Sequence, residues 1–255
     1  MAYSAFASFY DELMGDVDYE KITAFCVDKF RKNGIDSGIL LDLGCGSGTL
    51  CSYFADCGFD VIGVDPSEEM LSRAREKTFD KNPSVLLLNQ CGEELDLFGT
   101  VDLCVSTLDT LNHIETREGF IKTIGNVSLF MNKGGIFIFD VNTVYKHKNV
   151  LSFNSFVYEN DDVFCVWRNF YNESDNSVDI SLDFFINDGD TYLRDGDTYL
   201  RECEDFTELA FEIDDIKSIC LSCGFEILGI FDNYTNENIT DETERAVFVL
   251  RKSNE

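Results

Sequence analysis

The glycine-rich segment at residues 40–50, LLDLGCGSGTL, constrains the fold of this 255-residue chain more than any other feature. An apolar run ends at Leu43, and Gly44, Gly46 and Gly48 then take alternate positions before a helical pattern begins. Glycines between a strand and a helix let the backbone approach a ligand closely, and they leave N–H groups of the helix N-terminus free to bind it. The segment therefore predicts a ligand-binding loop of an α/β fold.

The hydrophobic pattern on either side of this loop predicts alternating helices and strands. A helix over residues 18–33 ends before Gly34, a residue suited to the left-handed position after a helix. Apolar runs and amphipathic stretches then give expected strands at 38–43, 60–64, 85–88, 101–106 and 135–141, and helices at 47–57, 67–78 and 117–131. Such apolar strands predict a parallel sheet with helices on both faces.

Residues 153–206 break this alternation. They hold four strand-like runs separated by Asn, Asp, Gly and Ser turns, which predict an antiparallel meander before a helix at 213–223 and strands at 225–232 and 245–250. We expect a core of residues 1–150 and 207–255, with residues 151–206 inserted as a lid or substrate platform. The repeat DGDTYLR occupies residues 188–194 and again 195–201, and we expect one copy to pair and the other to extend the turn.

Composition narrows the class of protein. Asp and Glu number 48 against 20 Lys and Arg, a net charge of −28, which makes nucleic acid an unfavourable partner and favours solubility over attraction of a cationic substrate. The 10 cysteines show no disulfide framework, and Cys220 and Cys223 lack further zinc ligands, so we expect buried reduced thiols and no metal. Neither a signal peptide nor a membrane span is predicted, and we expect a cytoplasmic protein. The sequence does not indicate its oligomeric state.

Asp65 supplies the second half of the ligand-site pattern. It ends the next apolar strand, about 20 residues after Gly44, where a carboxylate can accept both hydroxyl protons of an adenosine ribose. An Asp before a proline is by itself typical of a turn, but its spacing from the glycine loop favours ribose binding. Met70, in the first turns of the following helix, is placed to pack on the adenine.

Three segments, LLDLGCGSGTL, VIGVDPSEEML and GGIFIFDVNT, together resemble the bacterial class I S-adenosylmethionine-dependent methyltransferases. The first residues, including YSAFASFYDELMGDVDYEKI, resemble the leader of a Gram-positive subgroup of that family. The resemblance covers nearly the whole chain. It implies a Rossmann-like fold with a mostly parallel, seven-stranded sheet, S-adenosylmethionine as cofactor and S-adenosylhomocysteine as product.

The resemblance also implies roles for individual residues. Asp42, Gly44 and Cys45 would line the methionine end of the cofactor, and Thr107 and Leu108 would lie beside the sulfonium. The chain departs from the family at Cys91, where an Asp usually reads the adenine amino group, so the N–H of Gly92 and nearby Glu93 would take its place. The expected cofactor contacts are Tyr3, Tyr10, Asp42, Gly44, Cys45, Gly46, Gly48, Asp65, Pro66, Met70, Cys91, Gly92, Thr107 and Leu108.

Methyl transfer from a sulfonium depends mainly on alignment, but an amine or hydroxyl acceptor must also lose a proton. Asp109 and His113 follow the fourth parallel strand, where such sheets build their ligand crevice, and they are the first candidates for a catalytic role. Tyr10 and Tyr145 are further candidates. Most of these residues also have a purely structural interpretation. Asp109 can cap a turn, and His113 can be a partly buried polar residue. Tyr3 and Tyr10 can pack in the core instead of covering the methionine moiety.

His147, the other histidine, stands among lysines, and we expect it to be solvent-exposed.

Two other functions remain open at this point. A nicotinamide-dependent oxidoreductase also uses a glycine loop and a strand-end acid, although GxGxG spacing and the lack of a second nucleotide-binding half disfavour it. A non-catalytic protein that binds S-adenosylmethionine would carry the same site, because a fold does not fix activity. A small molecule is the expected methyl acceptor.

Overall fold

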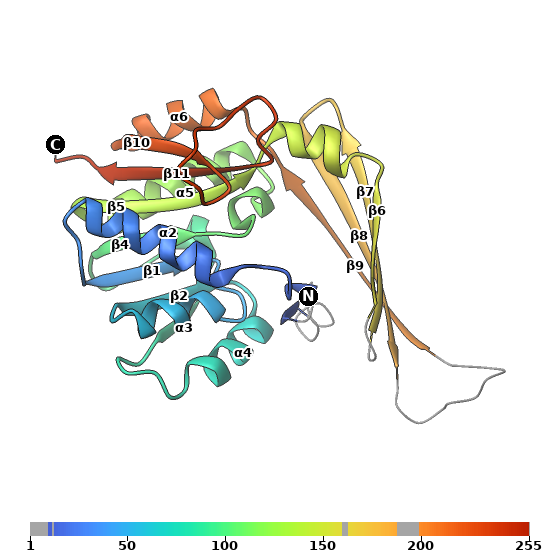
Figure 1. The fold of residues 1–255 in the computed structure, drawn as a ribbon, viewed down its shortest axis with the longest axis horizontal. Coiled ribbons are helices and arrows are strands. Elements are labelled where there is room, and N and C mark those ends of the chain that lie inside the picture. The colour runs from blue at the N-terminus through green and yellow to red at the C-terminus, as the bar shows by residue number, and fades with distance from the viewer. Residues whose placement is uncertain (1–9, 12, 160–162, 188–198, 255) are drawn as a thin grey trace.

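Two separate sheets organise the part of the chain that the computed structural model describes, residues 10–254 without 12, 160–162 and 188–198 (Figure 1). The larger sheet has seven strands in the order β10-β11-β5-β4-β1-β2-β3. β11 runs antiparallel to β5 and β10, and the pairs from β5 to β3 are parallel. Its strands are β1 Ile39–Leu43, β2 Asp60–Asp65, β3 Leu86–Asn89, β4 Val101–Ser106, β5 Met131–Asn142, β10 Phe225–Asp232 and β11 Arg245–Lys252. The predicted Rossmann-like α/β fold is confirmed.

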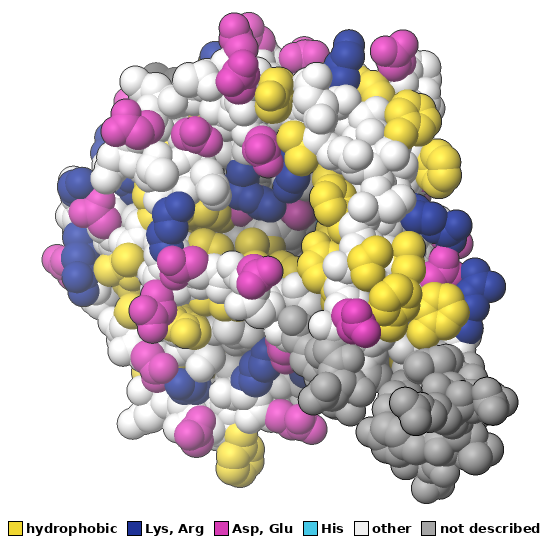
Figure 2. Space-filling model, turned by 45° about the vertical axis from the view of Figure 1, so that its right-hand side comes forward, with side chains coloured by type: hydrophobic (Ala, Val, Ile, Leu, Met, Phe, Trp, Pro, Cys, Tyr) yellow, Lys and Arg dark blue, Asp and Glu magenta, His cyan; other side chains and the backbone are white. Residues whose placement is uncertain are grey.

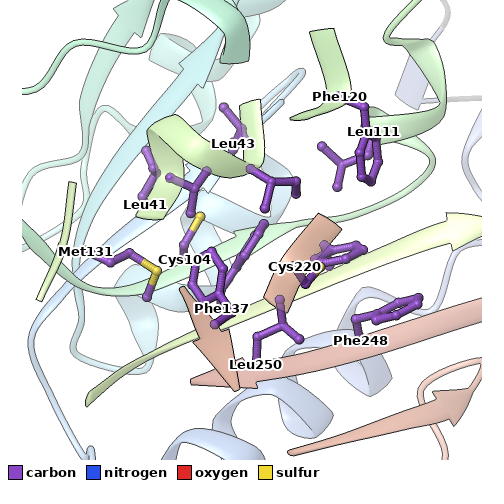
Figure 3. Close-up of a cluster of buried hydrophobic side chains, with 14 of the residues drawn as sticks. Leu41, Leu43, Cys104, Leu111, Phe120, Met131, Phe137, Cys220, Phe248 and Leu250 are labelled. Carbon is purple, nitrogen blue, oxygen red and sulfur yellow. The ribbon is translucent and has the colours of Figure 1, made fainter. Parts of the chain in front are cut away.

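Helices cover both faces of this sheet because alternate residues of each strand point to opposite sides. In β5, Phe137 and Phe139 join one hydrophobic cluster (Figure 3), while Ile136 and Ile138 join the other. α5 and α6 contribute to the first cluster, and α2, α3 and α4 to the second. The helices are α2 Tyr19–Lys32, α3 Thr49–Asp56, α4 Glu68–Thr78, α5 Arg117–Phe130 and α6 Ile213–Ser222.

The second sheet is the predicted antiparallel meander, and it extends away from the core (Figure 1). Its order β6-β7-β8-β9 follows the sequence, with strands β6 Ser155–Glu159, β7 Val163–Asn172, β8 Ser177–Asn187 and β9 Tyr199–Leu209. The last three residues of the second DGDTYLR copy pair in β9 with residues 185–187 of β8. The first copy lies outside the described residues, so the expectation that it extends the turn stays a prediction.

The sequence interpretation is wrong about His147. A π-helical turn, Lys146–Leu151, follows β5 and turns this side chain inward, where it is fully buried. Its Nδ1 lies 2.9 Å from the carbonyl oxygen of Asn176. Flanking lysines suggest solvent exposure when the segment is considered as a loop, but a π-helical turn is rare and carries no sequence signal of its own.

The cysteines largely follow expectation, and all ten carry free thiols. Cys220 is buried in the cluster of α5 and α6, and Cys223 packs against it, which confirms helix packing for this pair. Cys57 and Cys203 are exposed, so the prediction of buried thiols is wrong for these two. No helix among the described residues is both long and apolar enough to cross a membrane.

Substitution of Phe248, which stacks on Phe139, tests the core of the larger sheet. Both side chains are fully buried, with ring centroids 4.8 Å apart and an interplanar angle of 8°. Phe248→Ala leaves a cavity between β11 and β5 and is expected to lower the free energy of unfolding by about 3–5 kcal/mol, measured by urea denaturation. Phe79→Ala is the control, because Phe79 is 90% exposed and its loss should cost less than about 0.5 kcal/mol. Equal effects of the two substitutions would contradict this assignment of the core.

Candidate functional site

The glycine loop joins β1 to α3 through a backbone that other residues would not tolerate. Gly44, Gly46 and Gly48 have φ angles of 77°, 51° and 78°, in the left-handed region that favours glycine. A Cβ added at Gly44 would lie 2.2 Å from Cγ2 of Thr110. The loop is anchored to β2, since the N–H groups of Gly44 and Cys45 both donate to the carbonyl of Val64.

The N-terminus of α3 is open toward this loop. Gly48 occupies the N-cap position and supplies no side-chain hydrogen bond to the first turn. The first N–H groups of a helix have no partner within the helix, so those of α3 are available to a ligand. Tyr10 of the N-terminal segment covers the loop, with Cε1 3.9 Å from the position of a Cβ at Gly46. These features fit the polar methionine end of S-adenosylmethionine.

Asp65 lies at the end of β2 with its carboxylate against the loop. Its Oδ2 accepts from the N–H of Gly46 and its Oδ1 from the N–H of Ser67, both at 2.9 Å. Burial nevertheless raises the pKa of Asp65. Two of the roughly four acceptor positions of a carboxylate are therefore used, and the others remain for the two hydroxyls of a ribose.

Two cavities lie beside the glycine loop and together form a trough, because Gly44 and Thr110 line both. One, of about 340 Å³, is lined by Leu43, Gly44, Pro66, Gln90, Cys91, Gly92, Glu93, Thr110, Leu111, His113, Ile114, Glu115, Thr116 and Thr123. The other, of about 40 Å³, is lined by Tyr10, Tyr19, Asp42, Gly44, Cys45, Ser47, Thr49, Leu50, Thr107, Leu108 and Thr110. Expected contacts to adenine thus line the first cavity, and those to methionine line the second. Four predicted contacts, Gly46, Gly48, Asp65 and Met70, line neither cavity, whereas Pro66 lines the first.

Asp42 is the buried acid of the smaller cavity. It is 1% exposed, and the Cys51 thiol donates to its Oδ2 over 3.1 Å. Burial raises the pKa of Asp42 to about 7. A carboxyl group in this position can meet the ammonium group of a bound methionine moiety.

The loop after β4 is held in an unusual conformation by Asp140 at the end of β5. Leu108 and Asp109 both have positive φ angles, 55° and 70°, which non-glycine residues rarely adopt. The N–H of Leu108 donates to Oδ2 of Asp140 over 2.8 Å, and the N–H of Asp109 donates to Oδ1 over 3.1 Å. Asp140 is fully buried and also accepts from Arg245 and Tyr234. The sequence analysis missed Asp140, although an acid ending an apolar strand is visible as a signal.

Asp109 is a poor candidate for a general base. Its Oδ1 lies 2.6 Å from Nη1 of Arg245, and despite burial the positive charges of Arg245 and Lys146 hold the pKa of Asp109 well below its usual range. A carboxylate stabilised in this way has little tendency to take a proton. Asp109 is better suited to fixing Arg245 and the loop than to acid–base chemistry.

His113 borders a third cavity, of about 270 Å³, between the loop after β4, the N-terminal segment and the small sheet. The lining residues are Tyr10, Leu13, Met14, Asp16, Val17, Leu108, Asp109, His113, Tyr158, Cys165, Trp167, Leu182, Phe206 and Glu208. The Nε2 of His113 is 3.9 Å from Oε1 of Glu208, which is 3% exposed. Its Nδ1 is buried and has no hydrogen-bond partner in the part of the chain that the structure describes.

Glu208 is a second site residue that was not predicted from the sequence. It lies on β9, and its carboxylate also accepts from Nδ2 of Asn142 at 2.9 Å and lies 3.4 Å from Nε2 of the buried His147. Its alternation with Phe206 could have placed both side chains on the inner face of the small sheet. Nothing in the sequence indicates that this face meets His113, because β9 and the loop after β4 are about 100 residues apart.

The tyrosines predicted as site residues lie in different parts of the molecule. Tyr10 lines both the 40 Å³ and the 270 Å³ cavities, and burial together with nearby acidic groups raises the pKa of its phenol far above the usual range, so it can donate a hydrogen bond but is a poor base. Tyr145 lines a different cavity, of about 400 Å³, beside α6. Tyr3 lies outside the described residues. The segment around Tyr10 is tied down by Asp11, whose Oδ1 is 2.5 Å from Nζ of Lys77.

The fold and this site define a class I S-adenosylmethionine-dependent methyltransferase, and comparisons with known proteins show that the chain belongs to that family. Residues 40–135 match the methyltransferase domain family. The chain is 30% identical over 253 residues to YqeM of Bacillus subtilis (strain 168), a protein named for methyltransferase activity, covering 99% of this chain and 98% of YqeM. S-adenosylmethionine is accordingly the cofactor of this enzyme.

Solved structures agree with this assignment. An S-adenosylmethionine-dependent methyltransferase from Clostridium acetobutylicum ATCC 824 is 32% identical, with a TM-score of 0.85 and 99% of each chain covered. CalS10, an amino pentose methyltransferase from Micromonospora echinaspora, shares the fold at 17% identity, with a TM-score of 0.76 over 99% of this chain and 98% of its own.

Asp65 provides the first test of the cofactor site. Asp65→Ala removes the acceptor proposed for the ribose hydroxyls and is expected to weaken S-adenosylmethionine binding by at least about tenfold, since each hydrogen bond to a charged group contributes roughly 1.5–3 kcal/mol. Isothermal titration calorimetry measures the affinity, and thermal melting checks that the variant folds. Asp60→Asn, an exposed change at the other end of β2, is the control. Unchanged affinity in Asp65→Ala would remove this residue from the site.

Asp42 makes folding stability depend on pH. Its folded-state pKa of about 7 lies above the ordinary value of 3.8, so between these values the folded protein holds a proton that the unfolded chain has released. This contribution therefore destabilises the fold progressively as pH rises from about 4 to about 7. Asp42→Asn lacks it, and the free energy of unfolding of the variant relative to the natural protein should increase by about 1–3 kcal/mol from pH 5 to pH 7.5. A difference that is flat with pH in urea titrations would show that Asp42 is ionised throughout.

Proposed function

We propose that this enzyme transfers the methyl group of S-adenosylmethionine to a small molecule bound in the 270 Å³ cavity, leaving S-adenosylhomocysteine. The observation that carries the proposal is that the third cavity and the cofactor trough have lining residues in common. Tyr10 and Leu108 line both the methionine end of the trough and the third cavity, and His113 lines both the adenine end and the third cavity. A methyl group at the middle of the trough would therefore face an acceptor in the third cavity.

Each part of the trough has a proposed partner in the cofactor. Cys91 and Gly92 would face the adenine, Asp65 would hold the ribose, and Asp42 with the N-terminus of α3 would hold the methionine moiety. The bound cofactor supplies a methyl group that is already electrophilic because it is attached to a positively charged sulfur. The chain must therefore bind, orient and exclude water rather than create a strong acid.

Orientation depends on the loop after β4. The carboxylate of Asp140 fixes the N–H groups of Leu108 and Asp109, so the side of the loop that borders both cavities is held rigidly. Tyr10 closes the trough from the N-terminal segment, which Lys77 and Asp11 attach to the core. A preorganised pocket of this kind lowers the entropic cost of aligning acceptor and methyl group.

His113 is the proposed acceptor of a proton from the methyl acceptor. Its imidazole borders the cavity, and Oε1 of Glu208 lies 3.9 Å from its Nε2, where a carboxylate stabilises the imidazolium that forms when Nε2 takes the proton. Asn142 donates to Glu208 and holds its carboxylate in place. Glu208 therefore acts on His113 through its charge.

A small-molecule acceptor fits the dimensions of the site. The cavity has room for one small ring system, and five side chains of residues 151–206 line it, namely Tyr158, Cys165, Trp167, Leu182 and Phe206. This segment would act as the substrate platform. CalS10, of similar fold, is itself named as acting on an amino pentose. The net charge of −28 also disfavours a nucleic-acid acceptor. An oxidoreductase that uses a nicotinamide cofactor is not favoured.

Binding and transfer assays test the proposed function together. Calorimetric titration with S-adenosylmethionine, S-adenosylhomocysteine and NAD should show binding of the two sulfur compounds only. Labelled methyl groups from S-adenosylmethionine should then appear in small molecules of a metabolite extract and not in a tRNA extract. Tight binding without transfer to any extract would identify a cofactor-binding protein that is not an enzyme.

His113→Gln tests the proton-transfer role. Loss of the general base is expected to lower kcat by about 100- to 10,000-fold while S-adenosylmethionine binding persists, because the trough keeps its other walls. Rates are measured with the labelled product of the metabolite screen. A decrease in kcat of less than about tenfold would exclude His113 as the base.

A further inference from the structure

We infer that the methyl acceptor is an amine, bound with its nitrogen between His113 and Glu208; this inference rests on the proposed function of the 270 Å³ cavity. Figure 2 shows the molecule hollowed between the core and the small sheet, with hydrophobic side chains gathered along the sheet. The acceptor class follows from the charges and rings that line the enclosed cavity.

The charged groups on the cavity wall are acidic. Among the described lining residues the ionisable side chains of fixed charge are Asp16, Asp109 and Glu208, and none is a lysine or arginine. Asp16 is exposed at the N-terminal segment, whereas Glu208 is buried at the opposite, inner end of the small sheet. A carboxylate or phosphate acceptor would be repelled from both.

The neighbouring cations do not neutralise the negative charge of the cavity lining. Arg245 is held between Asp109 and Asp140, at 2.6 Å and 2.5 Å. Lys146 also acts on Asp109, and its Nζ donates to Oδ1 of Asn142 over 2.8 Å. The positive charges of Arg245 and Lys146 therefore offset the negative charges of Asp109 and Asp140, which leaves Glu208 and Asp16 as the excess charge toward the acceptor.

Aromatic side chains from the small sheet complete the environment for a cationic ligand. Tyr158, Trp167 and Phe206 line the cavity, and Phe206 packs beside His113 with ring centroids 5.1 Å apart. The indole N–H of Trp167 donates to Oδ1 of Asn169, so its polar edge is already engaged. Aromatic rings attract ammonium groups, and the attraction is strongest where water is excluded. Carboxylate at one end and rings along the wall together favour an amine over a neutral alcohol.

The reaction then balances as follows. The bound ammonium R–NH3⁺ gives one proton to the imidazole of His113, and the freed lone pair of R–NH2 forms the new N–C bond to the methyl group. The C–S bond breaks with its electron pair remaining on sulfur, which becomes a neutral thioether, and R–NH2⁺–CH3 is the product. Glu208 stabilises the imidazolium until its proton passes to solvent.

A matched set of acceptors tests the inference on the full chain. Two ring scaffolds are compared, each with three reacting ends: 2-phenylethylamine, 2-phenylethanol and phenylacetate, and 6-amino-6-deoxyglucose, glucose and glucuronate. Binding is measured with S-adenosylhomocysteine bound: the amine of each set should bind at least about tenfold more tightly than the alcohol, and the carboxylate should not bind. Transfer is measured with labelled S-adenosylmethionine, and only the amine should accept the methyl group. Amine binding should weaken with added salt.

Variants separate the charges of the cavity from those of the surface. Asp16→Asn is expected to weaken amine binding about two- to fivefold, as for an exposed charge, and Glu208→Gln at least about tenfold. Asp205→Asn is the control, because Asp205 lies on β9 between Phe206 and Glu204 but is exposed on the outer face. Asp16 is exposed, so its variant folds even if Glu208→Gln does not.

The outcomes are distinguishable from failure of the proposed function. If S-adenosylmethionine does not bind, the methyltransferase function itself fails. If it binds and transfers, but an alcohol or carboxylate is bound or methylated as well as the matched amine, or no amine is methylated, the amine inference is overturned. Equal effects of Asp16→Asn and Asp205→Asn would likewise show that the cavity charge does not select the acceptor.

Discussion

The buried carboxylate of Asp140 is the interaction on which the rest of the site depends. It lies at the end of β5, where it joins the loop after β4, Arg245 of β11 and Tyr234 through hydrogen bonds. A buried charge is tolerated only when it is paired and fully hydrogen-bonded, and loss of one partner leaves the others uncompensated at a cost of about 3–5 kcal/mol. Three segments distant in sequence are thus locked together at the carboxyl end of the sheet.

These hydrogen bonds to Asp140 explain how the cofactor trough and the third cavity can be separated by a single loop. Positive φ angles at Leu108 and Asp109 would relax in a free loop, but the two N–H groups have Asp140 as their acceptor only in this conformation. Two residues of the segment after β4, Leu108 and His113, therefore line both the cofactor trough and the third cavity. Close approach of two reactants requires the wall between them to be thin and rigid.

Local patterns predicted most of the fold and the cofactor half of the site. The glycine loop and Asp65 could be found because each follows a strand at a fixed spacing, and parallel strands bring their carboxyl ends to one edge. Glu208 could not be found in this way, since its role depends on the docking of the small sheet against the loop after β4. His147 was misplaced because its burial comes from a π-helical turn, and Tyr145 proved to face another cavity because the chain turns away from the site after β5.

The acidic composition acquires a more specific meaning from the structure. From the sequence, a net charge of −28 indicates mainly solubility. In the structure, Arg245 lies between Asp109 and Asp140 and forms an ion pair with each, while Asp16 and Glu208 line the third cavity. Surface and cavity charges therefore have the same sign, and a cationic ligand would be attracted at long range and then retained at short range. An anionic ligand would be disfavoured at both stages, so the acidity acts on selectivity as well as on solubility.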